Sequence, residues 1–136
     1  MLRPVRRPWL LIIFGPSAVF VLGSLVLLFV LPYPVPKGAT PAQRLYLTNC
    51  ATCHGSDGRG SWRATLLLMR PGDFIDPRTL APLDDAYLLE LIKNGGANLG
   101  RPGMPAFGFH LSDAEIRELI AYLRALPTRT RTRPTP

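Results

Sequence analysis

The chain has 136 residues, which is enough for one small domain and a short additional segment. Sixteen Lys and Arg residues against nine Asp and Glu give a net charge of +7, which raises the possibility of nucleic-acid binding. Six of these cations lie at the two ends of the chain, and residues 37–126 carry ten basic and nine acidic residues. A nucleic-acid-binding module concentrates its positive charge on one folded face. The distribution therefore argues against a nucleic-acid partner.

A basic arm at residues 1–8, expected in the cytoplasm, precedes an uncharged stretch at residues 9–31, WLLIIFGPSAVFVLGSLVLLFVL. As a helix this stretch spans about 34 Å at 1.5 Å per residue, against about 30 Å for the hydrocarbon core of a bilayer. A signal peptide has an apolar run of only about 7 to 15 residues and ends in small residues. This run is longer and ends in PYPVPKG. We therefore predict a single transmembrane helix over 9–31.

The charges that flank this stretch predict its orientation. Three arginines precede it, and the short stretch that follows offers only Lys37. Positively charged flanks stay on the cytoplasmic side, so we expect a single-pass protein of the bacterial cytoplasmic (inner) membrane with its domain on the periplasmic side. Residues 32–40 are a Pro-rich linker, which favours an extended and semi-rigid connector. At about 3.1 Å per residue it reaches about 30 Å at most, so the domain stays near the lipid surface.

Residues 41–127 are predicted to form an all-α domain. Thr40 followed by Pro41 starts a helix that runs to residue 51, because the hydroxyl caps the helix and proline suits its first position. The section from 55 to 82 is mainly loop, with one helical turn around ATLLL. A second helix follows the cap Asp84 and stops at Gly95. Its buried face is expected to contain Leu88, Leu91 and Ile92.

The last helix opens with a capping box, in which Glu115 stands three residues after Ser112. Its apolar positions recur at helical spacing and predict a buried stripe of Ile116, Leu119, Ile120 and Leu123. Pro127 is expected to end this helix. The Arg/Thr/Pro tail at 128–136 has no apolar face and is expected to be disordered on its own. No alternation typical of strands occurs along the chain.

Both cysteines of the chain lie in NCATCHG, where His54 directly follows Cys53 and Cys50 stands three residues before it. Three chemistries use such a pair: a redox dithiol, half of a zinc site, or covalent attachment of a haem. A structural zinc site needs four ligands, and the other histidine, His110, is far away in the sequence. A thioredoxin-like dithiol needs strands around it. Cys-x-x-Cys-His is the attachment motif of a c-type haem, with the histidine as proximal iron ligand. The sequence predicts the haem.

Residues 41–126 resemble the class I (monohaem) cytochrome c family. CHGSDGRG is similar to the run that follows the second cysteine in bacterial members, and ELIAYLRAL is similar to their last helix. Tyr46 takes the place of a family aromatic on the first helix, and Ala42 the place of a small residue where the first helix crosses the last. Tyr122 is then expected to face the first helix. The resemblance implies helices that enclose one covalently attached haem c per chain.

The resemblance also implies a sixth iron ligand from the loop before the last helix. Met104 in GRPGMPAFG looks like the family's methionine ligand, and the flanking Gly and Pro favour a rigid loop. His110 is the alternative ligand, because haems with two histidines exist. Met69 is expected in the core on the proximal side.

Further residues are expected around the haem. Pro71 matches the place where members offer a backbone carbonyl to the proximal histidine, and Phe107 is expected in the core. Residues 94–100 should lie against the distal face, where glycine permits a close backbone approach. Candidates to reach the haem propionates are Arg59, Trp62 and Arg63.

Two strong axial ligands would leave iron with no open position, which indicates an electron carrier of a respiratory or photosynthetic chain and not an enzyme. The alternatives are a haem enzyme subunit, such as a peroxidase or a nitrogen-oxide reductase, and a gas-sensing module in which Met104 is a labile ligand. The expected partners are redox proteins and other subunits of a membrane electron-transfer complex. Because the linker at 32–40 is short and stiff, we expect a fixed subunit and not a swinging shuttle.

Overall fold

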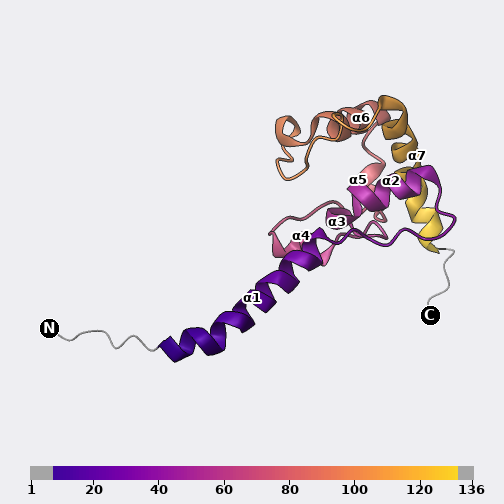
Figure 1. Ribbon diagram of the computed structural model, residues 1–136. Coiled ribbons are helices and arrows are strands. Elements are labelled where there is room, and N and C mark those ends of the chain that lie inside the picture. The colour runs from indigo at the N-terminus through magenta and orange to yellow at the C-terminus, as the bar shows by residue number, and fades with distance from the viewer. Residues whose placement is uncertain (1–7, 132–136) are drawn as a thin grey trace. The chain divides into compact units, whose positions relative to one another are not determined.

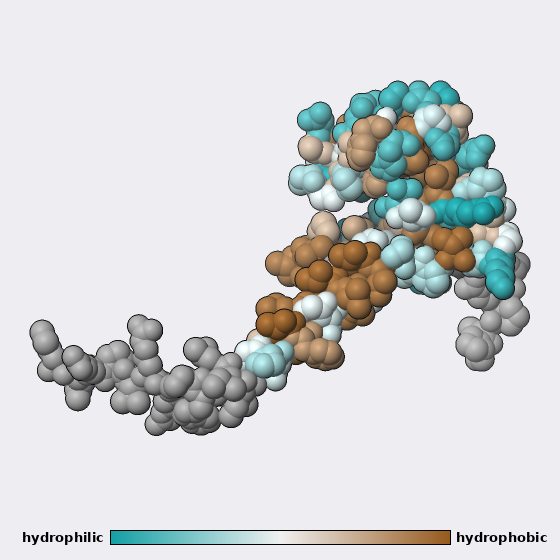
Figure 2. Space-filling view, in the orientation of Figure 1, coloured by the Kyte–Doolittle hydropathy of each residue, from teal (hydrophilic) through white to brown (hydrophobic). Residues whose placement is uncertain are grey.

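The structure is a computed structural model that describes residues 8–131, and the predicted basic arm lies almost wholly outside this range. The chain divides after Pro32 into two compact units. The first contains helix α1, Pro8–Val30, with Pro16 inside it. Large apolar side chains of α1 such as Val19 and Phe20 are exposed, and Figure 2 colours this part of the helix brown. When only the described residues are considered, no helix is both long and apolar enough to cross a membrane.

The second unit is built from short helices joined by long loops (Figure 1). They are α2 (Pro41–Asn49), α3 (Ala51–His54), α4 (Trp62–Leu66), α5 (Pro77–Leu80), α6 (Asp85–Asn94), the 3-10 turn η1 (Ala97–Leu99) and α7 (Asp113–Arg131). The described residues contain no strand, and the expected helical architecture is confirmed. Helix α7 packs against both α2 and α6.

The helices begin where the sequence places caps. The Thr40 hydroxyl accepts the Gln43 N–H at 3.2 Å, and the Asp84 carboxylate accepts the Tyr87 N–H at 2.7 Å. The capping box is complete, because Glu115 accepts the Ser112 N–H at 2.8 Å. Each bond satisfies a backbone donor that the first turn of a helix leaves without an intrahelical partner.

The core confirms the predicted apolar faces of α6 and α7. All seven residues of the two predicted stripes are at most 6% exposed: Leu88, Leu91, Ile92, Ile116, Leu119, Ile120 and Leu123. Tyr46 of α2 is fully buried, and its ring lies 5.4 Å from that of Tyr122 on α7. The contact between the first and last helices of the domain, which the family resemblance implied, is therefore present.

Two helix predictions were wrong. Helix α2 ends at Asn49, and a separate short helix, α3, carries the cysteine motif. Helix α7 does not stop at Pro127 but continues to Arg131. The turn around the proline is held because Leu126 is buried in the core and the Thr128 hydroxyl donates to the Ala125 carbonyl at 2.8 Å. The rest of the predicted tail lies outside the described residues.

Candidate functional site

One cavity of about 450 Å³ brings together residues that are far apart in the sequence. Cys50, Cys53 and His54 line it from the end of α2 and from α3, and Met104 lines it from the loop before α7. Apolar side chains make up much of the remaining wall: Leu80, Leu83, Leu88, Leu91, Ile92, Leu119 and Leu123. Binding sites for cofactors typically have volumes of about 300–1,000 Å³ and apolar walls. All four predicted site residues therefore share one cofactor-sized cavity.

The cysteine motif is positioned by backbone hydrogen bonds at the junction of α2 and α3. The Cys50 N–H donates to the Tyr46 carbonyl at 2.8 Å, and the His54 N–H donates to the Cys50 carbonyl at 2.9 Å. The four-residue spacing of Cys50 and His54 places them on the same side of the turn. The buried Tyr46 hydroxyl donates to the Gly55 carbonyl at 2.6 Å and fixes the end of α3. Helix α2 thus orients the motif from both ends.

The loop after α3 folds back onto the motif, and a glycine makes this possible. Gly55 has a φ of +76°, and a Cβ at this position would lie 2.7 Å from the Gly60 carbonyl oxygen. The Gly60 N–H donates to the His54 carbonyl at 2.8 Å, and the Ser61 N–H donates to the Cys53 carbonyl at 2.9 Å. Any larger residue at position 55 would push this loop away from the motif.

The imidazole of His54 has the properties that a metal ligand needs. It stacks on the ring of Phe74, with centroids 4.3 Å apart and an interplanar angle of 17°. Burial lowers the pKa of His54 to about 4, although the nearby Gly72 backbone opposes the shift. The ring is therefore neutral at pH 7 and keeps a lone pair for a metal. Pro71, the predicted source of a backbone carbonyl for this histidine, lines the cavity together with Gly72.

No hydrogen bond of regular geometry reaches the buried Nδ1 of His54. A buried polar atom without a partner is costly unless another group completes its environment. A haem with His54 as a ligand fits these features, because it would fill the apolar cavity and order the ring. The residues present match the cofactor that the motif predicts.

The thiols favour this interpretation over the other two chemistries. Burial, followed by the charge of Cys53, raises the pKa of Cys50 to about 12, and burial also raises the pKa of Cys53. A redox dithiol needs at least one thiol with a lowered pKa, so the environment disfavours that role. Among the described residues, no three His, Cys, Asp or Glu side chains are grouped to hold a metal ion. The geometry therefore gives no support to the zinc alternative.

The loop that carries Met104 is hydrogen-bonded to the C-terminal end of α6 and to the residues that follow it. The Gly96 N–H donates to the Met104 carbonyl at 2.9 Å, and the Phe107 N–H donates to the Ile92 carbonyl at 3.0 Å. Gly95 has a φ of +80°, and a Cβ there would lie 3.1 Å from the Met104 carbonyl oxygen. Residues 94–100 were expected against the distal face of the haem. Gly100 lines the cavity, whereas Gly95 lies against the loop that holds the methionine.

The alternative ligand, His110, does not line the cavity. Its Nε2 lies 3.0 Å from Asn49 Oδ1, and its ring contacts Phe107 and Phe109. Met69 does line the cavity, contrary to the core position we predicted. A Cβ on Gly103 would lie 3.2 Å from the Met69 sulfur, so Met69 packs beside the Met104 loop. Phe107 is partly buried against the core, as expected, and also lines the cavity.

The predicted propionate partners are not in the cavity wall. Arg59, Trp62 and Arg63 are absent from the lining, and Arg70 and Arg101 are present. Each of these two arginines begins an Arg-Pro-Gly tripeptide. This repeated tripeptide is the sequence signal that could have identified both residues.

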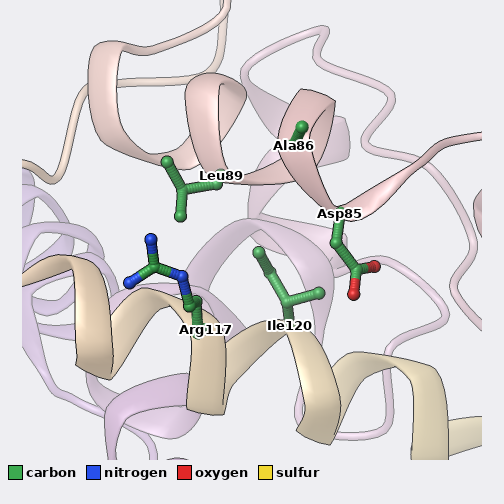
Figure 3. Close-up of a pocket in the computed structure, with 5 residues that line it drawn as sticks. All are labelled: Asp85, Ala86, Leu89, Arg117 and Ile120. Carbon is green, nitrogen blue, oxygen red and sulfur yellow. The ribbon is translucent and has the colours of Figure 1, made fainter.

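A second cavity, of about 490 Å³, lies between α6 and α7 (Figure 3). Leu89 and Ile120 line it together with Ala86, and Arg117 and Asp85 bring the polar atoms. The Asp85 carboxylate already accepts a hydrogen bond from Arg124 at 2.8 Å. This cavity contains no thiol, imidazole or thioether, so we place the functional site at the cysteine motif.

The chain is similar in sequence to known proteins. The family model described as cytochrome c oxidase, cbb3-type, subunit III matches residues 38–123. The chain is 32% identical over 93 residues to the cbb3-type cytochrome c oxidase subunit FixP of Azorhizobium caulinodans, which covers 65% of this chain and 29% of that protein. Identity to the cbb3-type cytochrome c oxidase subunit CcoP of Azospirillum sp. (strain B510) is 34% over 92 residues, covering 68% of this chain and 28% of that protein.

A solved structure is also similar to this chain. The KustC0563 c-type cytochrome superposes with a TM-score of 0.52 and 29% sequence identity, covering 62% of this chain and 95% of that one. The chain spans less than a third of the length of the curated relatives it matches, so the comparison concerns the cytochrome domain alone. The matched residues include the whole cysteine motif and the Met104 loop. The chain belongs to the cytochrome c family represented by cbb3-type oxidase subunit III, whose cofactor is haem c.

Proposed function

We propose that this protein is a membrane-anchored monohaem cytochrome that carries single electrons on the periplasmic side of a respiratory chain. The observation that carries the proposal is the shared cavity, which collects two thiols, a neutral imidazole and a thioether within apolar walls. Haem c, when bound, supplies a one-electron iron centre. Cys50 and Cys53 would hold it covalently, and His54 and Met104 would be the axial ligands.

This ligand set favours electron transfer over catalysis. A His/Met pair fills both axial positions and raises the reduction potential of the iron. Met104 is held by the clamped loop, which disfavours its release to open a coordination site. The apolar wall excludes water and lowers the local dielectric. Carbon monoxide binding by the reduced protein at neutral pH would contradict this assignment and favour a gas-sensing role.

Arg70 and Arg101 would pair with the haem carboxylates, because a guanidinium binds a carboxylate through two parallel hydrogen bonds. Removing a positive charge beside the iron disfavours the reduced form, which carries one positive charge less than the oxidised form. We therefore expect Arg70→Gln and Arg101→Gln to lower the reduction potential. Arg59→Gln is the matched control, since Arg59 does not line the cavity and should leave the potential unchanged. Potentiometric titration of the three variants tests the assignment.

The two cysteines differ from the axial ligands in the effect expected on replacement. Cys50→Ser or Cys53→Ser should weaken covalent attachment, and the double variant should leave a largely unfolded domain. The physical reason is that short helices and long loops bury limited apolar area without the cofactor. Circular dichroism and haem staining of denaturing gels measure the two effects. A double variant that folds like the native protein would contradict the role of the cofactor in the core.

Membrane anchoring is supported by the uncharged sequence 9–31 and by the helical conformation of α1. The matched relatives are named as subunits of a cbb3-type oxidase. With the short linker at 32–40, this supports a fixed subunit of a membrane complex of that kind. Solubilisation of native membranes in mild detergent, followed by identification of the proteins that co-purify with the haem, tests this proposal. A lone chain with full electron-transfer competence would contradict it.

A further inference from the structure

Helix α4 presents apolar side chains outward from the cytochrome domain. Trp62, Leu66 and Leu67 are 51%, 59% and 57% exposed, whereas Ala64 of the same helix is buried. We call these three exposed residues the α4 patch. None of the three lines the cavity at the cysteine motif, so binding of the cofactor there does not account for the patch.

The start of α4 contacts Tyr33, the first residue of the second unit. The Tyr33 hydroxyl lies 3.1 Å from the Ser61 hydroxyl, and the Arg63 guanidinium lies 4.9 Å from the centroid of the Tyr33 ring. Tyr33 is three residues after Val30, the last residue of α1. Three residues extend about 10 Å at most. The start of α4 therefore contacts the residue at which the chain enters the cytochrome domain.

The segment of the sequence that contains α4 is also the more basic part of the domain sequence. Residues 32–72, which contain α4, carry five basic residues and one acidic residue, whereas residues 73–127 carry five basic and eight acidic residues. Arg59 stands three residues before the first residue of α4, and Arg63 stands within the helix. Tryptophan, leucine and arginine together are typical of segments that lie in the interface of an anionic bilayer. The patch and the arginines next to it in the sequence thus have the chemistry of such a segment.

We propose that the α4 patch docks on the anionic surface of the membrane and fixes the orientation of the cytochrome domain. The proposal rests on the anchoring role of α1 proposed above. The apolar side chains of the patch enter the interfacial layer. Arg59, whose Nε lies 3.8 Å from an Asp57 carboxylate oxygen, is exposed beside them and faces the lipid phosphates.

Spin labelling of the full-length holoprotein in lipid nanodiscs tests this proposal. Both native cysteines are used by the haem, so Leu66→Cys provides a single reactive thiol. Phe109→Cys is the matched control, because Phe109 is an apolar residue that is 83% exposed on another loop. Leu22→Cys on α1, where the leucine is 62% exposed, reports on the anchor itself. The accessibility of each label to oxygen and to a nickel chelate measures its depth in lipid.

In nanodiscs that contain phosphatidylglycerol, we expect the label at residue 66 to have an oxygen-to-nickel ratio several-fold higher than the label at residue 109. An oxygen-to-nickel ratio typical of water at residue 66, with a ratio typical of lipid at residue 22, would overturn the docking proposal but leave the membrane anchor supported. A ratio typical of water at residue 22 would instead overturn the membrane anchor on which the docking proposal rests. Protection of residue 66 from both reagents only when partner subunits are present would overturn it in favour of a protein interface.

Discussion

Gly95 joins the end of α6 to the loop that carries Met104, and replacing it tests how that loop is held. Its φ of +80° and ψ of 173° form a conformation that is used almost only by glycine. An alanine Cβ would lie 3.0 Å from the Ala106 nitrogen and 3.1 Å from the Met104 carbonyl oxygen. Both neighbours are backbone atoms, so relief of the contact requires movement of the loop itself. Gly95→Ala should therefore displace the proposed ligand.

Gly38→Ala is the matched control, because it isolates backbone strain from steric contact. Gly38 also has a positive φ, +82°, but a Cβ there meets no atom within 4 Å, and Gly38 does not line the cavity. An alanine at positive φ costs about 1–2 kcal/mol, which is the whole loss of stability expected at residue 38. An alanine at residue 95 adds backbone strain of about 1–3 kcal/mol and also the cost of moving the loop. We therefore expect Gly95→Ala to lower the free energy of unfolding by about 2–4 kcal/mol in total.

Guanidinium unfolding of the two holoproteins measures the free energies, and the absorption spectrum reports the ligand. We expect Gly95→Ala to weaken the sulfur-to-iron band at the red end of the spectrum and Gly38→Ala to leave it unchanged. Equal losses of stability with an intact band in both variants would show that the Met104 loop does not depend on Gly95.

Three further predictions address the ligand, the motif and the last helix. Met104→Ala should retain the haem, lower the reduction potential and abolish the sulfur-to-iron band. An unchanged spectrum in this variant, together with a changed spectrum in His110→Ala, would make His110 the sixth iron ligand instead. Tyr46→Phe leaves the Gly55 carbonyl buried without its donor and should cost about 1–3 kcal/mol in denaturant unfolding; no loss would show that the hydroxyl does not stabilise α3. Hydrogen bonds from the Ser112 N–H and hydroxyl lower the pKa of Glu115 below its ordinary value of 4.5. The charge of Glu115 therefore stabilises the fold above that pH, and the stabilisation is lost as the carboxylate is protonated in acid. The difference in free energy of unfolding between the native protein and Glu115→Gln should then vanish at low pH. A difference that does not depend on pH would contradict this role.

The sequence was most informative where local chemistry decides the structure. The caps at Thr40 and Ser112, and the apolar stripe of α7, depend on residues within one or two turns. The cysteine motif likewise places its thiols and imidazole through short-range bonds such as that between the His54 N–H and the Cys50 carbonyl. Such features follow from spacing alone.

Features that depend on long-range packing could not be predicted in this way. Arg70 and Arg101 reach the cavity because two loops fold toward each other, and neither loop has a periodic pattern that specifies its path. Met69 lies beside Gly103, 34 positions later, for the same reason. Helix α7 passes Pro127 because the core holds Leu126. In each case tertiary contacts outweigh the local preference that the sequence displays.

Mass spectrometry of the intact holoprotein under denaturing conditions tests whether one haem is covalently attached at the cysteine motif. We expect a mass equal to that of the chain plus one haem. We also expect a proteolytic peptide containing Cys50 and Cys53 to carry the whole added mass. A chain that loses its haem on denaturation, or that carries the addition elsewhere or twice, would contradict the assignment of a single covalently held haem at this motif.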